Sequence, residues 1–240
     1  MWNERLKFLV GVEEIAKLAK ATVAVIGIGG VGSFVAESLA RSNIGKLILV
    51  DHDIVDETNI NRQLLALTST IGKPKVEVMK ERIGMINKEC EVISHQSFIN
   101  SENISEIIGT DVDYIVDAID TITSKLDLIE YAQKNGIKVI SSLGMGNRID
   151  PTKIYLTKLN KTENDPLARA LRQAARKREM DLKVDVVCSS EQAKRAIKEE
   201  NEDGETTKEK HPIASAIFVP ASAGLIIGSK VVRDLIGRDD

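Results

Sequence analysis

The sequence predicts an α/β protein with a Rossmann-like fold, in which a mostly parallel sheet continues into antiparallel strands in the C-terminal part and carries helices on both faces. Its length of 240 residues suits one large domain. Short apolar runs alternate with segments of helical period, which favours βαβ units. One apolar run ends in the glycine-rich turn VAVIGIGGVGS, and strand–glycine–helix turns of this kind hold phosphate.

Five apolar or β-branched runs predict the strands of a first half that ends near residue 150. They are TVAVIG, KLILVD, EVISHQ, DYIVDA and KVISSL. Helical periods lie between several of them, at VGSFVAESLARSN and TSKLDLIEYAQKNG. Pro74 suits the first turn of another helix, and Asn135-Gly136 suits a helix end before the next strand.

The pattern changes over residues 151–240, although we expect residues 1–240 to form a single domain. KIYLTKLN and LKVDVVCS predict strands without regular crossovers, and DPLARALRQAARKRE predicts a helix capped by Asp165. The uncharged stretch 213–229 predicts a buried strand followed by a buried helix, because it is short for a membrane span and Pro220 divides it. The charged stretch 191–211 predicts a loop or a partly helical lid.

The composition excludes several classes of protein. A net charge of −3 and a pI of 5.8 exclude a globally basic nucleic-acid binder, although a local basic patch is compatible with them. Cys90 and Cys188 form no C-x-x-C pair, which argues against a disulfide framework and a zinc knuckle. The charged N-terminal segment does not resemble a signal peptide, so we expect a cytoplasmic protein that does not use a membrane.

The glycine turn predicts a nucleotide site without deciding which nucleotide it holds. Gly27 permits a tight turn, Gly29 lets the backbone approach a phosphate, and Gly32 lets the following helix pack against the sheet. Asp51 ends the next predicted strand, where a carboxylate can accept hydrogen bonds from a ribose diol. These features suit NAD and ATP equally.

The segment that follows favours a triphosphate. DHDIVDETNINRQ and GKPKVE place a polar cluster and two lysines beyond the second strand: Asn59, Asn61, Arg62, Gln63, Lys73 and Lys75. Arginine and lysine beside a glycine turn neutralise a polyphosphate, and arginine can bind it with two parallel hydrogen bonds. A departing pyrophosphate, on which charge develops, needs this more than a dinucleotide does.

Asp120 follows the predicted strand DYIVDA at the carboxyl edge of the sheet, where ligands bind in open α/β folds. Its carboxylate can hold Mg²⁺ beside the nucleotide. The alternative is that Asp120 caps the helix that follows. We expect Asp117 to be buried or capping instead of catalytic.

GIGGVGS, VDHD, TNINRQ, GKPK and DAIDT, in this order and spacing, resemble the ThiF/MoeB/HesA superfamily of ubiquitin-activating-type enzymes, which adenylate a carboxylate with MgATP. The resemblance covers residues 5–150 and implies that this half binds ATP. Asp120 would organise Mg²⁺, while Arg5 would reach the ATP of the partner in a homodimer or, alternatively, lie on the surface. Apart from Arg5, the predicted ATP site comprises Gly27, Gly29, Gly30, Gly32, Asp51, Asn59, Arg62, Gln63, Lys75 and Asp120.

Three later segments resemble the tRNA threonylcarbamoyladenosine dehydratase branch of this superfamily: SSLGMGNRIDPTKI, NKTENDPLARALRQAARKRE and SAIFVPASAGLIIGSKVVRDLI. The resemblance implies that ATP activates the threonine carboxylate of the modified adenosine in tRNA as an acyl-adenylate. The side-chain amide of the same nucleoside then closes a ring. Residues 151–240 would contact substrate and the second subunit.

A basic helix face in the second half agrees with an RNA substrate. At 100° per residue, three arginines lie opposite three apolar residues. The alternative is a basic face that contacts only solvent. The two sets are Arg169, Arg172 and Arg176, and Leu167, Leu171 and Ala174.

Two other functions stay open. The first is a carrier-protein-activating enzyme, which would bind a small ubiquitin-like protein. The second is an NAD oxidoreductase or a nucleotide sensor, neither of which would adenylate a carboxylate. A thioester-forming enzyme would need Cys188 as a nucleophile, although a buried cysteine usually acts as a small apolar residue. A monovalent cation near SSLGMGN and a cysteine desulfurase partner also stay open.

Overall fold

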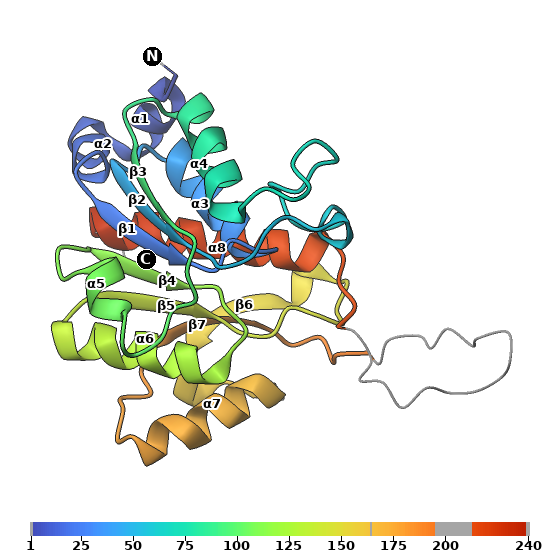
Figure 1. The fold of residues 1–240 in the computed structure, drawn as a ribbon. Helices are drawn as coiled ribbons and strands as arrows, with labels where there is room; N and C mark the ends of the chain where they lie inside the picture. The colour runs from blue at the N-terminus through green and yellow to red at the C-terminus, as the bar shows by residue number, and fades with distance from the viewer. Residues whose placement is uncertain (1, 164, 195–212, 239–240) are drawn as a thin grey trace, which may run out of the picture.

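Residues 2–163, 165–194 and 213–238 are described in the structure, a computed structural model, and contain a seven-stranded sheet of order β3-β2-β1-β4-β5-β7-β6 (Figure 1). Neighbouring strands are parallel except β6, which runs antiparallel to β7. The predicted fold class is therefore confirmed. The strands are β1 (Thr22–Ile26), β2 (Lys46–Val50), β3 (Glu91–His95), β4 (Tyr114–Asp117), β5 (Lys138–Ser142), β6 (Ile154–Lys158) and β7 (Asp185–Ser189).

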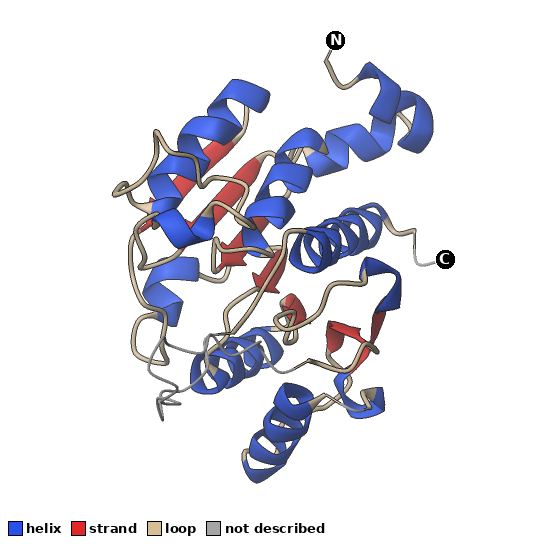
Figure 2. Ribbon diagram, turned by 90° about the vertical axis from the view of Figure 1, so that its right-hand side faces the viewer, coloured by secondary structure: helices blue, strands red, loops and turns tan. Residues whose placement is uncertain are grey.

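Helices cover both faces of the sheet (Figures 1 and 2). Helices α2, α3, α4 and α8 pack on the face that receives Val23 and Val25, whereas α5 and α6 pack on the face that receives Ala24 and Ile26. Helix α7 packs beside α6, in a cluster that also includes Val186 and Cys188 of β7. The helices are α1 (Glu4–Val10), α2 (Val12–Leu18), α3 (Gly32–Arg41), α4 (Lys75–Ile86), α5 (Ile104–Ile108), α6 (Ile122–Asn135), α7 (Pro166–Lys177) and α8 (Phe218–Ile236), with short 3₁₀ turns η1 (Glu57–Asn59), η2 (Pro151–Lys153) and η3 (Leu159–Lys161).

Strands β1, β2 and β4 end in register, because Ile26 pairs with both Val50 and Asp117. The chain segments that leave these strands therefore start side by side at the carboxyl edge of the sheet. The glycine turn, Asp51 and the segment that contains Asp120 are all at this edge, so the topology brings together motifs that are far apart in the sequence.

The C-terminal part differs from the sequence prediction in one element. Residues 213–217 form no strand, and Ile213 is exposed, because hydrogen bonds tie this stretch to two loops instead of to a sheet edge. The buried helix is present as α8. Among the described residues, no helix has the length and hydropathy needed to cross a bilayer. Most of the predicted charged loop, residues 195–211, lies outside the described residues.

Two predicted helix boundaries agree with the structure to within a residue. Gly136 adopts a left-handed conformation with φ of 66° and ends α6. Pro74 lies directly before α4, at the N-cap position, and not inside the first turn. Asp165 caps α7 as predicted, since its side chain accepts a hydrogen bond from the backbone N–H of Ala168.

Candidate functional site

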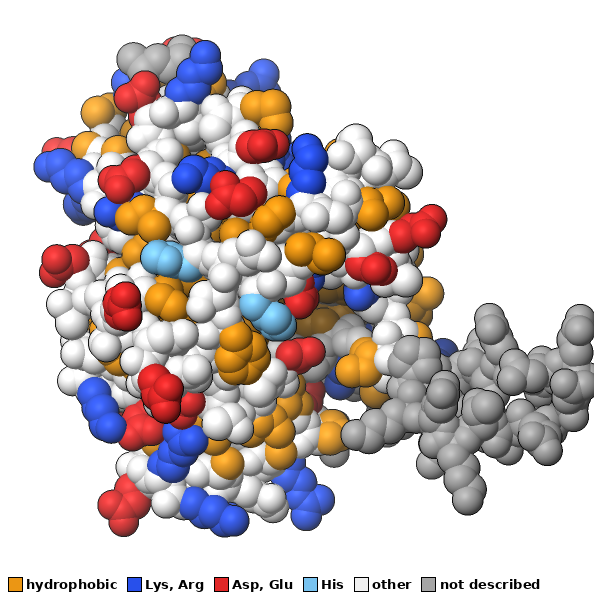
Figure 3. Space-filling view, viewed as in Figure 1, with side chains coloured by type: hydrophobic (Ala, Val, Ile, Leu, Met, Phe, Trp, Pro, Cys, Tyr) orange, Lys and Arg blue, Asp and Glu red, His pale blue; other side chains and the backbone are white. Residues whose placement is uncertain are grey.

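A pocket of about 340 Å³ lies at the carboxyl edge of β1, β2 and β4. The space-filling view shows a hollow near the middle of this face, with acidic, basic and histidine side chains around it (Figure 3). Arg5 and Gly32 do not line the pocket. Nine predicted site residues do: Gly27, Gly29, Gly30, Asp51, Asn59, Arg62, Gln63, Lys75 and Asp120.

The glycine turn lines the pocket, and each of its glycines is required for a different physical reason. Gly27 has φ of +88°, and a Cβ there would lie 2.8 Å from the carbonyl oxygen of Ala118. A Cβ on Gly32 would lie 1.7 Å from the carbonyl oxygen of Gly27, so α3 can start only with glycine at this point. At Gly29 the nearest atom is 3.9 Å away, which leaves room for a phosphate.

Asp51 fixes the glycine turn to the end of β2. One carboxylate oxygen accepts the backbone N–H of Ile28 at 2.6 Å, and the other accepts the backbone N–H of Asp53 at 2.9 Å. Each oxygen keeps a further lone pair for a ligand hydroxyl. The carboxylate therefore lies beside the predicted ribose position and also supports the loop that surrounds it.

Lys75 enters the pocket from the first residue of α4. Its Nζ lies 2.6 Å from Asp53 Oδ2, and its side chain is 6% exposed while that of Asp53 is 49% exposed. Partial burial raises the pKa of the Asp53 carboxyl, but the hydrogen bond and charge of Lys75 outweigh it, so the pKa lies below its ordinary value. The ammonium group is thus held on one side and has donors left for an anion.

Asn59, Arg62 and Gln63 come from a compact turn after β2. Asn59 is buried and closes a capping box with Asp56. Gln63 is 7% exposed, and its Oε1 has no hydrogen-bond partner among the described residues. A buried acceptor without a partner is costly, so this oxygen indicates that a ligand hydroxyl or a water belongs in the pocket.

Asp120 is exposed in the loop between β4 and α6. Among the described residues, its carboxylate accepts one hydrogen bond, from the Thr121 hydroxyl at 3.4 Å. The capping alternative is wrong, because Thr121 occupies the N-cap position of α6 and no side chain caps this helix. A carboxylate with free oxygens beside a phosphate-sized space is a suitable ligand for Mg²⁺.

Comparison with known proteins places the chain in a family. A family model described as "ThiF family" matches residues 3–237. The chain belongs to the ThiF family. It is 44% identical to the tRNA threonylcarbamoyladenosine dehydratase of Bacillus subtilis over 97% of this chain and 93% of that protein.

Two crystal structures of the E. coli tRNA N6-threonylcarbamoyladenosine dehydratase are similar to this ThiF-family chain. The complex with AMP has a TM-score of 0.86 and 35% identity, and it covers 98% of this chain and 94% of that one. The complex with ATP has the same TM-score and identity, and covers 98% and 93%. The similarity includes the second half, because the shared coverage extends well beyond the glycine turn.

The ThiF-type pocket also contains residues that the sequence reading missed. Phe98 and Ile99, from the segment after β3, line the pocket together with the glycine turn. The rings of His52 and Phe98 meet edge to face, with 5.3 Å between their centroids. His52 was not among the predicted site residues, and no motif pointed to Phe98. Their only signal was their position just after parallel strands.

The second half modifies the predicted basic face of α7. Arg178, directly after this helix, forms ion pairs with Asp127 at 2.6 Å and Glu130 at 3.1 Å on α6. Arg172 donates to the carbonyl and hydroxyl of Thr162, which holds it half-buried. The exposed charges of the predicted stripe are therefore those at its two ends, Arg169 and Arg176.

Neither cysteine has the surroundings of a nucleophile. Cys188 lies in β7 at 1% exposure, and burial raises the pKa of its thiol. Burial also raises the pKa of Cys90 to about 11. Both thiols are therefore neutral at physiological pH, and Cys188 acts as a small apolar residue.

Proposed function

We propose that this protein binds ATP in the pocket and uses it to activate the carboxylate of threonylcarbamoyladenosine in tRNA, after which a ring closes. The observation that carries the proposal is a pocket with a glycine turn, two cationic side chains and an exposed carboxylate, in a chain that matches an ATP-bound relative over nearly its whole length. Adenylation would turn a poor leaving group into a good one. The closure is intramolecular, so it needs positioning and no protein nucleophile.

Each side chain has a role in this reaction that follows from its place. Asp51 would accept the ribose hydroxyls, and Asn59 and Gln63 would complete that contact. Arg62 and Lys75 would neutralise the phosphates as pyrophosphate leaves. The low pKa of Asp53 keeps this carboxylate ionised, and its charge holds the Lys75 ammonium at the phosphate end of the pocket.

The proposed cofactor is MgATP, and Asp120 is the residue that would hold Mg²⁺. The donor set fits, because its carboxylate is exposed toward the pocket and makes one weak hydrogen bond. Bound Mg²⁺ would neutralise the phosphate oxygens. A monovalent cation near residues 141–147 stays a prediction; it would share the carbonyl oxygens of Gly144 and Gly146 with Arg148.

Activation of a ubiquitin-like carrier protein is the alternative. It is less well supported, because the chain has no C-x-x-C pair and Cys188 is buried. A cysteine desulfurase partner stays a prediction from the sequence. A tRNA substrate would agree with a cytoplasmic location, which stays a prediction.

The decisive experiment incubates the purified protein with MgATP and tRNA that carries threonylcarbamoyladenosine. Mass spectrometry of the digested nucleosides should detect the loss of one water from that nucleoside, only with ATP. Unmodified tRNA and the Lys75→Ala variant are the controls, and neither should react. Pyrophosphate exchange that needs a carrier protein instead of tRNA would favour the alternative.

A homodimer with composite sites is part of the proposal. Arg5 lies exposed on α1, outside its own pocket, where it is available to a second copy of the chain. Phe8 and Leu9 on the same helix are also exposed and would be covered by association. Mixing the inactive variants Arg5→Ala and Lys75→Ala should restore part of the activity, because each mixed dimer then has one intact site. No recovery after subunit exchange would contradict an Arg5 contribution across the interface.

A further inference from the structure

Asn61 belongs to the polar turn after β2, but the proposed reaction gives it no role. The two polar atoms of its side-chain amide make hydrogen bonds to different parts of the chain. Oδ1 accepts a hydrogen bond from Arg62 Nη1 at 2.9 Å, and Nδ2 donates to the backbone carbonyl of Ser215 at 2.8 Å. One side chain therefore joins the arginine of the pocket to the segment that precedes α8, 154 positions away in the chain.

The contact leaves Arg62 in a defined orientation. Nη1 donates to Asn61 and also to the backbone carbonyl of Thr58 at 2.7 Å, so both of its hydrogens are used. No described residue accepts a hydrogen bond from Nε or Nη2. These two groups form one edge of the guanidinium plane and can bind two phosphate oxygens in parallel. Asn61 thus leaves free the edge that a phosphate needs.

The segment that Asn61 contacts is itself fixed to the loop after β5. Asn147 donates its backbone N–H to the carbonyl of Ala214 at 2.6 Å and accepts the backbone N–H of Ala214 on Oδ1 at 2.9 Å. Asn147 has a left-handed backbone with φ of 60°, which asparagine tolerates better than most residues do. Residues 213–217 are therefore held between two loops, through Asn147 on one side and Asn61 on the other.

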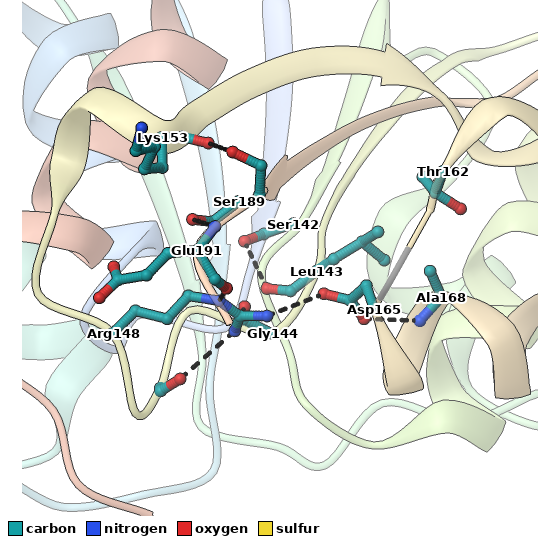
Figure 4. Close-up of polar contacts among 12 residues, drawn as sticks. Ser142, Leu143, Gly144, Arg148, Lys153, Thr162, Asp165, Ala168, Ser189 and Glu191 are labelled. Carbon is teal, nitrogen blue, oxygen red and sulfur yellow. Dashed lines mark hydrogen bonds and ion pairs between the residues drawn. The ribbon is translucent and has the colours of Figure 1, made fainter. Parts of the chain in front are cut away.

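The loop after β5 is anchored in turn to α7 by a buried arginine. Figure 4 shows the Arg148 side chain among Gly144, Glu191 and Asp165, with its guanidinium hydrogen-bonded to backbone carbonyls and ion-paired with Asp165. Asp165 is the N-cap of α7. A continuous series of polar contacts thus leads from the start of α7, through Arg148, Asn147 and residues 214–215, to Asn61 and the pocket.

We propose that Asn61 is a positioning residue, which orients Arg62 for the nucleotide phosphates and makes that orientation depend on residues 213–217. This inference rests on the proposed ATP-binding role of Arg62. It adds that the phosphate end of the pocket is sensitive to the second half of the chain, where α7 is the proposed contact for tRNA. Substrate contacts at α7 would thereby influence the orientation of Arg62 through this series of contacts, in addition to the direct contact of the reacting carboxylate with ATP.

The test is a double-mutant cycle on ATP affinity, measured by titration calorimetry with MgATP and no RNA. Asn61→Ala should weaken ATP binding about fivefold, the effect of losing one modest hydrogen bond. Arg62→Ala should weaken it more. In the Arg62→Ala background, Asn61→Ala should have no further effect, because Asn61 acts only through Arg62. Independent, multiplying effects would overturn the proposal, as would wild-type affinity in Asn61→Ala.

Two further variants separate positioning from general damage. Ser215→Ala keeps the backbone carbonyl that Asn61 uses, so ATP affinity should be unchanged. Asn147→Gly keeps the left-handed backbone but removes one of the two hydrogen bonds to Ala214, and should weaken ATP binding about twofold. That loss should vanish when Asn61 is already alanine; a loss that persists would overturn the link through residues 213–217. If the unaltered protein did not bind ATP at all, the proposed function itself would fail.

Discussion

Two lysine–aspartate pairs lie at the carboxyl edge of the same sheet, and they have opposite characters. Lys125 and Asp117 are both 0% exposed, with Nζ 2.9 Å from the carboxylate. The ammonium also donates to the Ser141 hydroxyl at 3.1 Å and to the Ser142 carbonyl at 2.7 Å. Lys75 and Asp53 have a shorter separation, but Asp53 is half-exposed and both side chains line the pocket.

The difference shows that pairing alone does not mark a functional site. All three ammonium hydrogens of Lys125 are donated to acceptors in the protein, so none remains for a ligand. These hydrogen bonds connect the ends of β4 and β5 to the start of α6. Lys75 has one side-chain acceptor among the described residues, and it lines the same pocket as Gln63, whose Oε1 has no partner there. We therefore expect the first pair to govern stability and the second to govern activity.

The largest expected effect is on stability, when the buried pair is broken. Lys125→Met leaves the Asp117 charge buried without its partner, which should lower the free energy of unfolding by about 3 to 5 kcal/mol. Urea denaturation followed by circular dichroism measures this. Lys134→Met is the control on the same helix, since its ion pair with Glu130 is exposed and should contribute at most about 0.5 kcal/mol. Equal losses in both variants would remove the distinction between the two pairs.

Changes inside the pocket should do the reverse. Asp120→Ala should lower ATP-dependent turnover by about 100- to 1,000-fold, because a charge that organises the reacting phosphate is lost, while the free energy of unfolding stays within about 0.5 kcal/mol. Steady-state turnover and urea denaturation measure the two quantities. Asp111→Ala, an exposed residue before the other end of β4, is the control and should change neither. Retained turnover in Asp120→Ala would contradict the site assignment.

The same contrast between paired and free charges applies to α7. Arg176 is exposed and has no ion-pair partner among the described residues, whereas Arg178 next to it is paired twice. Arg176→Glu should raise the KM for tRNA by about tenfold at low salt and reduce the salt dependence by about one phosphate contact. The KM for ATP should not change. Steady-state rates measured over a range of salt concentrations give both KM values. An unchanged KM for tRNA would mean that the basic face of α7 contacts only solvent.

The smallest effect concerns pH. The pKa of Asp53 is lower in the folded state than in the unfolded state, so its pairing with Lys75 adds stability above the ordinary aspartate pKa of about 4. That contribution is lost as the pH falls through the lower, folded value. Asp53→Asn should therefore flatten the dependence of unfolding free energy on pH in this acid range, and the variant should be slightly less stable than the unaltered protein at neutral pH, where the pairing contributes in full. The same slope in the variant would assign the acid sensitivity to other carboxyl groups.

The parts of the site that lie in short sequence motifs could be predicted from the sequence, whereas those that depend on contacts between distant segments could not. The glycine turn, the polar turn at residues 59–63 and Asp120 were found because each is a short motif whose residues lie in fixed positions relative to a strand end. Phe98 was missed because its place in the pocket is set by strand order, which no local pattern specifies. Lys125 was missed for a similar reason: it lies on a helix of ordinary amphipathic pattern, and only the packing of three elements buries it.

The second half was predicted less completely, because its elements are determined by contacts between distant segments. The helix at 166–177 was recognised from its cap and period, whereas the pairing of Arg178 with α6 depends on how two helices pack. Residues 213–217 read as a buried strand because they are apolar. Their backbone instead bonds to Asn61 and Asn147, and a one-dimensional pattern does not contain those partners.

Whether the pocket uses ATP to adenylate a carboxylate can be tested by following one oxygen atom. The substrate is tRNA whose threonylcarbamoyladenosine carries heavy oxygen in its carboxylate, and AMP and phosphate are analysed by mass spectrometry after one turnover. Adenylation forms a bond from the carboxylate oxygen to the α-phosphorus and releases pyrophosphate, and ring closure then leaves that oxygen on AMP. Adenylation therefore predicts label in AMP and none in pyrophosphate or phosphate. Label in phosphate, with ADP as the other product, would contradict it.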